Sequence, residues 1–464
     1  MIRKILAAGC FFVVTNTTFA QSKNSKQSIL PIGVFDSGTG GLTVLNAMLT
    51  MDLFNNTTGA PGADGKPDFD AEYFQYLADQ SNMPYGNYAA EKKTDLLKEH
   101  ILKNIDFLIG KQYAVNTTGI NWVNKEKPPV KLIVVACNTA TAYALPEMKF
   151  YLNKKAANIA CIGVIDAGAK AALEWQQKNE EGLIGVFATV GTVASNGYPR
   201  TLLALAKTMG INEPLIFSHG GLGLAESIDR DWDYFVDTLH QTRQTYKGPS
   251  VKNKNYTIDT TLLPIYNFSN ASNKLLCEYD DKGSCLDIQL NDPSNYVRYH
   301  LVSLLEGLLK NSKGKKMNTL ILGCTHYPFM KDSIRFVLDE MYNYTTNGIY
   351  RYREVLSSKV ELIDPSVETA KEAYKTLMKM QLANKSIKEK MQFFISVPNT
   401  ALGEVALQKD GWFTYQYKYG RVAGENKEYV RVVPFDQKNI AAATYNRFRE
   451  ALPKVYTAIQ KASQ

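Results

Sequence analysis

Long apolar runs are scarce in this chain of 464 residues. Outside residues 1–20, no stretch approaches the ~20 uninterrupted apolar residues of a membrane-spanning helix, so we expect a mature protein without a membrane partner. The net charge of +8 is spread out, and no basic block is interleaved with aromatics, so nucleic acid is not indicated. Only five histidines occur, with no Cys-x-x-Cys pair, so we expect no metal site.

The amino terminus is the exception to this lack of apolar runs. It reads MIRKILAAGCFFVVTNTTFAQ, in which Arg3 and Lys4 precede an apolar stretch that ends in small residues at Ala20. This pattern is typical of a cleaved secretory signal peptide, and it is too short to span a membrane. We therefore predict a signal peptide over residues 1–20 and a periplasmic or secreted mature protein.

Cysteine is also rare, with six residues. Cys10 would leave with the signal peptide, and Cys161 lies in the apolar segment NIACIGVID, where a core position is expected. Cys277 and Cys285 flank the polar loop EYDDKGS, and in an oxidising compartment they are the natural disulfide pair. Two further cysteines remain to be explained, each at the end of an apolar run.

Short, β-branched segments that are apolar on both faces alternate with helical stretches through most of the chain. Strands of this kind form parallel sheets covered by helices, so the predicted fold class is α/β. The expected strands lie within residues 31–41, 72–79, 131–138, 159–166, 182–189, 319–326 and 360–364.

Two parts of the chain echo each other. IGVFDSGTGGLTV from Ile32 and IGVFATVGTVASN from Ile184 share a strand and a turn of glycines and hydroxyls, and each is followed by a strand ending in cysteine, VVACNT and LILGCTH. This suggests two related halves, each a small α/β unit with one cysteine at the carboxyl end of a strand. The second half is longer, which we attribute to a polar insertion at about residues 241–295.

Those two cysteines, Cys137 and Cys324, should lie where ligands bind in open α/β sheets, outside the carboxyl ends of the strands. Each precedes an expected helix, whose amino terminus favours a thiolate and attracts a carboxylate ligand. Inverting a carbon centre by proton transfer needs a base on one face and an acid on the other. Two thiols on opposite walls of a cleft would supply both.

A carbanion formed in this way needs fixed donors and exclusion of water. Asp36 and His326 are titratable neighbours that could tune the thiols or accept a proton. Hydroxyls and amides suited to the donor role stand at the strand ends, at Ser37, Asn138, Thr139, Thr189, Thr192 and Thr325.

Six motifs occur in an order that resembles glutamate racemase, a cofactor-independent member of the aspartate/glutamate racemase superfamily. They are GVFDSGTGGLTVL, PYG at residues 84–86, ACNTATA, ATVGTVASNGY, AES around Glu226, and GCTHYP. The resemblance covers about residues 29–401 and implies two pseudo-symmetric, doubly wound α/β domains with the active site in the cleft between them. We assign residues 29–165 and 340–464 to the first domain and residues 166–339 to the second.

The resemblance also implies roles for individual residues. Cys137 and Cys324 become the catalytic acid/base pair, which interconverts L- and D-glutamate without a cofactor, and the D-glutamate would serve peptidoglycan synthesis. The residues expected to contact the amino acid are Asp36, Ser37, Tyr85, Gly86, Asn138, Thr139, Thr325 and His326, with Glu226 near the cleft.

Several alternatives stay open. The substrate could be another acidic amino acid such as aspartate, or the chain could be a periplasmic protein that binds an acidic amino acid or a cell-wall peptide on the same fold. Tyr85 could serve packing alone, and Glu226 could be a solvated acid at a helix start. A homodimer is one possibility for the assembly. The tail after about Gly403, with YVRVVPF and a final helix from Asn439, has no assigned role.

Overall fold

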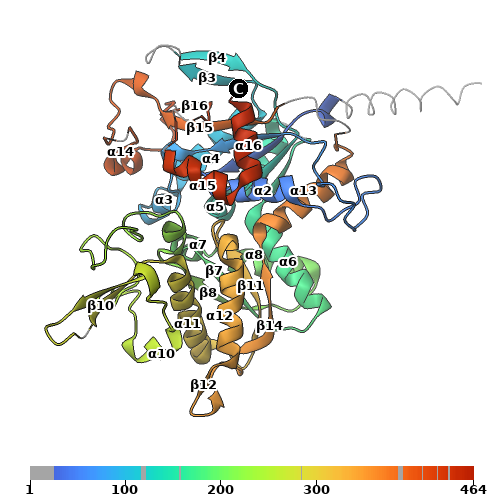
Figure 1. Ribbon diagram of the computed structural model, residues 1–464. Helices are drawn as coiled ribbons and strands as arrows, with labels where there is room; N and C mark the ends of the chain where they lie inside the picture. The colour runs from blue at the N-terminus through green and yellow to red at the C-terminus, as the bar shows by residue number, and fades with distance from the viewer. Residues whose placement is uncertain are drawn as a thin grey trace, which may run out of the picture.

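The computed structural model describes residues 26–463 except 117–121, 156–157, 284, 385–389, 410, 426, 437–438 and 441. The predicted signal peptide, with Cys10, lies outside the described residues. In the part of the chain that is described, no helix combines the length and apolar character needed to cross a membrane. Figure 1 shows two α/β units, one above the other.

The first unit is built on a sheet in the order β16-β15-β2-β1-β5-β6. Its strands pair in parallel, except that β16 is antiparallel to β15. The strands are β1 (Ile32–Asp36), β2 (Phe74–Ala78), β5 (Leu132–Val135), β6 (Ala160–Gly163), β15 (Gln392–Pro398) and β16 (Val430–Pro434).

The second unit is built on a wholly parallel sheet in the order β14-β11-β7-β8. Its strands are β7 (Leu183–Ala188), β8 (Leu215–Gly220), β11 (Met317–Gly323) and β14 (Leu356–Ile363). Two helix-covered sheets with parallel pairing confirm the predicted α/β class.

The two sheets repeat one topology. In chain order, β1, β2, β5 and β6 occupy the positions that β7, β8, β11 and β14 occupy in the other sheet, since the orders are β2-β1-β5-β6 and β8-β7-β11-β14. The sequence echo therefore corresponds to a structural repeat. Strands β5 and β11, which precede the two cysteines of interest, are equivalent.

Helices cover both faces of each sheet, which explains why the strands are apolar on both faces. One core cluster includes Ile32, Val34 and Val186, and so runs through both units, whereas Phe35 points to the opposite face of the first sheet. The main helices are α2 (Leu42–Thr50), α4 (Thr94–Ile109), α5 (Asn138–Lys155), α6 (Val164–Lys178), α8 (Gly197–Met209), α11 (Pro293–Asn311), α12 (Lys331–Asn343) and α13 (Pro365–Met380).

The boundary predicted at residues 339 and 340 is wrong. Strand β14 lies beyond it and pairs with β11, so the second unit extends to Ile363. The physical reason is the repeat itself, because β14 is the fourth strand of the second sheet, equivalent to β6. The chain returns to the first unit with α13, which packs against α2.

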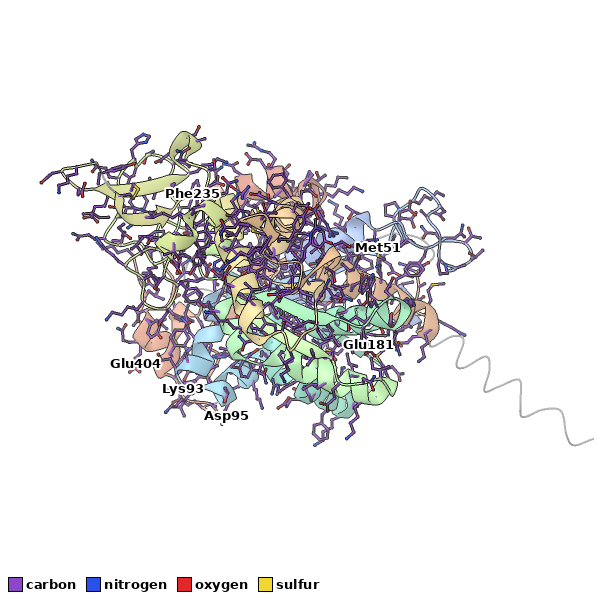
Figure 2. The ribbon with its side chains drawn as sticks, turned by 90° about the horizontal axis from the view of Figure 1, so that it is seen from below. Met51, Lys93, Asp95, Glu181, Phe235 and Glu404 are labelled. Carbon is purple, nitrogen blue, oxygen red and sulfur yellow. A yellow bond between two sulfur atoms is a disulfide. The ribbon has the colours of Figure 1, made fainter. Side chains whose placement is uncertain are left out.

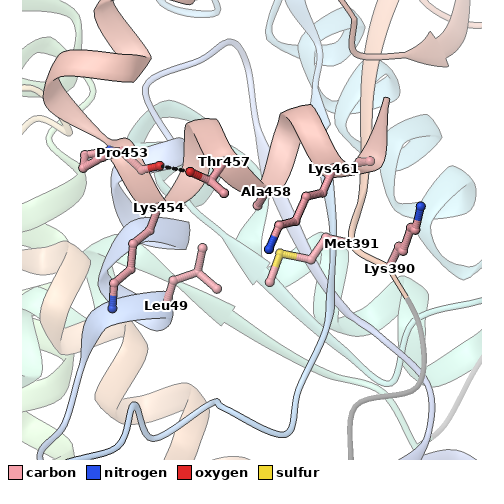
Figure 3. A pocket seen from close by; sticks show the side chains of 9 residues that line it. Leu49, Lys390, Met391, Pro453, Lys454, Thr457, Ala458 and Lys461 are labelled. Carbon is pink, nitrogen blue, oxygen red and sulfur yellow. Dashed lines mark hydrogen bonds between the residues drawn. The ribbon is translucent and has the colours of Figure 1, made fainter. Parts of the chain in front are cut away.

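The carboxyl-terminal tail is part of the first unit. Strands β15 and β16 extend its sheet, and the single final helix expected from Asn439 is instead two, α15 (Ala442–Ala451) and α16 (Pro453–Ala462). Pro453 begins the second of them, as expected for a residue that fits the first helical turn. An open pocket of about 610 Å³ lies beside α16, between Leu49, Met391 and three lysines (Figure 3). None of its lining residues is a predicted site residue.

The segment between α9 (Leu224–Ile228) and α11 contains the predicted insertion. Its hairpin of β9 (Leu275–Tyr279) and β10 (Cys285–Leu290) projects from the second unit, on the side that Phe235 marks in Figure 2. A disulfide joins Cys277 to Cys285, which confirms the predicted pair.

Candidate active site

Cys137 and Cys324 occupy equivalent places in the two units. Cys137 lies between β5 and the start of α5, and Cys324 lies between β11 and a 3₁₀ turn, η4 (Tyr327–Met330), that leads into α12. Each side chain is free of disulfide bonding and 5% exposed. The predicted helix follows Cys137 directly, but the 3₁₀ turn separates Cys324 from its helix.

Cys137 is held at the amino terminus of α5. Its sulfur accepts the Ala140 N–H at 3.4 Å, and its thiol donates to Ser37 Oγ at 3.5 Å. Burial and then the Asp36 carboxylate raise the pKa of Cys137 to about 12, although the Ser37 and Ala140 contacts lower it. Cys137 is therefore a protonated thiol at neutral pH, suited to donate a proton.

Asp36 shapes the loop that carries Ser37. Its Oδ2 accepts the N–H groups of Gly38 at 3.1 Å and Gly41 at 3.0 Å, and the side chain is buried. A Cβ on Gly41 would lie 2.6 Å from the Asp36 Cβ, so this turn needs glycine. Asp36 thus acts on the thiol by its charge and by fixing the loop, and its carboxylate is occupied by backbone donors.

Cys324 has a different partner. The His326 Nδ1 lies 3.7 Å from the Cys324 sulfur, and the His326 Nε2 lies 3.1 Å from Asp229 Oδ1. Burial alone would lower the pKa of His326, but Asp229 and the Cys324 sulfur outweigh burial and hold that pKa well above its usual value. His326 is thus an imidazolium that donates to both partners, and a cation beside a sulfur favours the thiolate.

Asp229 and Arg447 complete this cluster, and neither was predicted from the sequence. The Arg447 Nη1 donates to the same Asp229 Oδ1 that pairs with His326. Glu226 stands one helical turn before Asp229, and burial raises the pKa of its carboxyl group. That spacing is the one sequence signal that could have pointed to Asp229.

Residues of the two units meet around the cysteines. A Cβ on Gly40 would lie 2.5 Å from Thr325 Oγ1 and 3.2 Å from His326 Cε1, so the loop after β1 touches the Cys324 loop. Tyr198, from α8, donates its hydroxyl to Asn138 Oδ1 at 3.1 Å. The structure therefore brings together predicted residues from both halves, and it adds Tyr198, whose only sequence signal was its place in ATVGTVASNGY.

Other predicted donors are engaged locally. Thr189 caps the short helix α7 (Val190–Ala194), its hydroxyl donating to Thr192 Oγ1 at 2.9 Å and accepting the Thr192 N–H at 3.3 Å. Thr139 and Thr325 are half-buried, and Thr325 Oγ1 lies 3.5 Å from His326 Nδ1. The predicted substrate contacts of these hydroxyls stay predictions.

The Tyr85 hydroxyl is committed to a buried network. It donates to Asp79 Oδ2 at 2.5 Å and accepts from Asn104 Nδ2 at 3.0 Å, and the side chain is 2% exposed. Gly86, the next residue, begins α3 (Gly86–Ala90), and a Cβ there would lie 3.8 Å from the Gly191 Cα of the second unit. The packing interpretation of Tyr85 is thus the better one for its side chain.

Metal ligands do not gather at this site. Among the described residues, no three of His, Cys, Asp and Glu are grouped so as to hold a metal ion. The arrangement offers instead a protonated thiol, a sulfur paired with an imidazolium, and the amino terminus of α5, which favours a carboxylate ligand.

No protein-family model matches the chain. It is 26% identical over 355 residues to the glutamate racemase of Oceanobacillus iheyensis, covering 76% of this chain and 82% of that protein. It is 25% identical over 366 residues to the glutamate racemase of Thermoanaerobacter pseudethanolicus, covering 79% and 88%. Among solved structures, a glutamate racemase isoform from Bacillus anthracis gives a TM-score of 0.46 with 23% identity, over 79% of this chain and 88% of that one. The Francisella tularensis glutamate racemase in complex with D-glutamate gives 0.44 with 20% identity, over 83% and 91%.

Proposed function

Because this chain is a distant homologue of the glutamate racemases, within the aspartate/glutamate racemase superfamily, we propose that it interconverts the L and D forms of an acidic amino acid, glutamate first. One observation carries the proposal. Two free, buried cysteines follow equivalent strands of two repeated sheets, Cys137 as a protonated thiol and Cys324 beside His326.

In the proposed proton transfer, Cys324 beside the His326 imidazolium acts as the base that removes the α-proton from one face of the amino acid, and the Cys137 thiol returns a proton to the other face. At the end of the turnover Cys324 carries the proton and Cys137 is the thiolate. The Ala140 N–H and the Ser37 hydroxyl then stabilise the Cys137 sulfur, so the reverse reaction runs from that state.

The amino terminus of α5 is suited to hold a carboxylate of the substrate. Asn138 and Thr139 stand in its first turn, where backbone N–H groups have no partner within the helix. Donors fixed in a buried site stabilise the charge that develops on the α-carbon and its carboxylate. The two thiols supply both acid and base, so the proposed reaction needs no cofactor.

We further propose that the protein is exported, as its amino-terminal sequence predicts. The disulfide between Cys277 and Cys285 supports this proposal, since such bonds persist in oxidising compartments. The catalytic thiols have little exposure to oxidants, because each side chain is 5% exposed.

Exchange of the α-proton in deuterated water tests the reaction. L- and D-glutamate are incubated separately with wild-type protein, and deuterium uptake and inversion are followed by mass spectrometry and chiral chromatography. We expect both in the wild type, no inversion in Cys137→Ala or Cys324→Ala, and normal activity in Cys161→Ala, which removes a buried thiol from the interior of β6. A wild type that exchanges neither glutamate, aspartate nor a D-glutamate peptide would favour the binding-protein alternative.

A further inference from the structure

The carboxyl-terminal helices place one cation against the site. Helices α15 and α16 are anchored in the first unit, since Phe448, Val455 and Ile459 are buried in the core that also holds Phe435 and Leu45. Helix α15 lies on the side of that unit that faces the second (Figure 1). From it, Arg447 reaches across to Asp229, which is 218 residues away in the sequence.

A chain of contacts connects the Arg447–Asp229 pair to the Cys324 sulfur. Asp229 Oδ1 accepts from Arg447 Nη1 and pairs with His326 Nε2 at 3.1 Å, and His326 Nδ1 faces the Cys324 sulfur at 3.7 Å. Both ends of the Arg447–Asp229 pair also line a cavity of about 1030 Å³, together with Thr39 from the loop after β1. The pair therefore lines this cavity, and it joins one unit to the other.

We propose that Arg447 is a positioning residue, which through Asp229 and His326 sets the orientation and charge of the pair that activates Cys324. This inference rests on the proposed racemase function. The tail thus acts on the chemistry through a chain of three contacts, and Arg447 itself touches neither thiol in this scheme.

Two effects of Arg447 support this role. It fixes the Asp229 carboxylate, because a guanidinium holds a carboxylate in a defined orientation. It also balances charge, since His326 and Arg447 are the two cations that lower the pKa of Asp229 against the effect of burial. Without Arg447 that pKa is lowered less, so the Asp229 carboxylate that pairs with His326 is lost at a higher pH.

The test compares Arg447→Met with Arg449→Met, which removes an exposed arginine from the same helix. Cys137→Ala first identifies the enantiomer that Cys324 deprotonates, because only that one then exchanges. In the Cys137→Ala background we expect Arg447→Met to lower the exchange rate of this enantiomer about tenfold, the scale for losing a charged hydrogen bond, and in the Cys324→Ala background to leave exchange of the other enantiomer unchanged. The pH below which the exchange rate falls should be higher in Arg447→Met than in the wild type. Arg449→Met should match the wild type, and Arg447→Lys should recover part of the loss.

The outcomes separate the two proposals. A wild type without α-proton exchange overturns the proposed function and the inference with it. An active wild type whose Arg447→Met variant matches Arg449→Met overturns the inference alone, as does an equal loss of exchange in the Cys137→Ala and Cys324→Ala backgrounds with an unchanged pH profile, which would mean a purely structural role. If Arg447→Met does not fold, Asp229→Asn breaks the same chain of contacts, and normal kinetics in that variant would likewise overturn the inference.

Discussion

Tyr198 of the second unit donates a hydrogen bond to Asn138 of the first, at 3.1 Å, and Asn138 directly follows Cys137. Burial and then the nearby Cys324 sulfur raise the pKa of the Tyr198 phenol well above its usual value, so it stays a protonated donor. Tyr198 is therefore hydrogen-bonded to the residue that follows Cys137, and it lies close enough to Cys324 for that sulfur to raise its pKa. This contact links the geometry around Cys137 to the geometry around Cys324.

Replacing Tyr198 with phenylalanine tests that link. The ring would still fill its buried site, but the half-buried Asn138 carbonyl would lose its donor, which costs about 1 kcal/mol of stability. We expect racemisation to fall several-fold, because the contact links the loops that carry both cysteines. Denaturant unfolding and α-proton exchange measure the two effects. Tyr151→Phe is the control, since it removes a hydroxyl bonded to Asp106 at the surface, and equal activity losses in the two variants would contradict the link.

The two thiols should differ in reactivity. Cys137 has a pKa of about 12, so at neutral pH it is almost wholly protonated, whereas Cys324 faces a protonated His326. Because the thiolate is the nucleophile, we expect iodoacetamide at pH 7 to alkylate Cys324 before Cys137, although both are equally exposed. Peptide mass spectrometry at successive times gives both rates.

A histidine variant identifies the cause of that difference. His326→Asn should slow alkylation of Cys324 and leave that of Cys137 unchanged, because it removes the cation from one sulfur only. Faster modification of Cys137 in the wild type would contradict the role given to His326.

Most strands of the two main sheets could be predicted because their apolar character is local. Val34 and Phe35 are adjacent and both fully buried, on opposite faces of one strand, and this produces the continuous apolar run that predicts a parallel sheet. Strand β8 was missed because its residues are only half-buried at the sheet edge and include Ser218 and His219. The cysteines could be found because each follows an apolar strand directly.

The rest of the site depends on contacts that leave no local pattern. Asp229 follows a short helix, and Arg447 belongs to a polar stretch near the end of the chain, so only the folded structure brings them together. The domain boundary was misplaced for a related reason. A strand segment indicates that a sheet exists but not which of two similar sheets it joins, and β14 joins the second.

Gly40 lies where the loop after β1 touches the Cys324 loop of the second unit. A methyl group there would lie 2.5 Å from Thr325 Oγ1, so Gly40→Ala forces the loops apart. We expect a loss of about 1–3 kcal/mol in stability, as for other overpacked contacts, and weaker racemisation. Thermal unfolding and α-proton exchange provide the measurement.

Two further variants define that effect. Gly420→Ala is the control, because a Cβ there meets nothing within 4 Å, and we expect it to be near neutral. Thr325→Ala in the Gly40→Ala background should restore part of the lost stability by removing the obstructing hydroxyl. A double variant no more stable than Gly40→Ala would show that the contact does not limit the approach of the units.

The Asp229–His326 pair gives stability a defined dependence on pH. The folded-state pKa of His326 is raised, so its contribution is complete below the unfolded value of about 6.5 and is lost as the pH rises through the folded value. The pKa of Asp229 is lowered, mainly by His326 and Arg447 against the effect of burial, so its contribution is lost as the pH falls toward that value. Between these limits, Asp229→Asn should lower the free energy of unfolding by about 1 kcal/mol, since the partly exposed pair is screened by solvent.

Urea unfolding at a series of pH values should show this difference at pH 6 and a smaller one at alkaline pH. Asp237→Asn, which breaks an exposed pair with Arg230, should show no such trend, and a difference for Asp229→Asn that did not shrink with rising pH would mean that His326 is neutral in the folded protein.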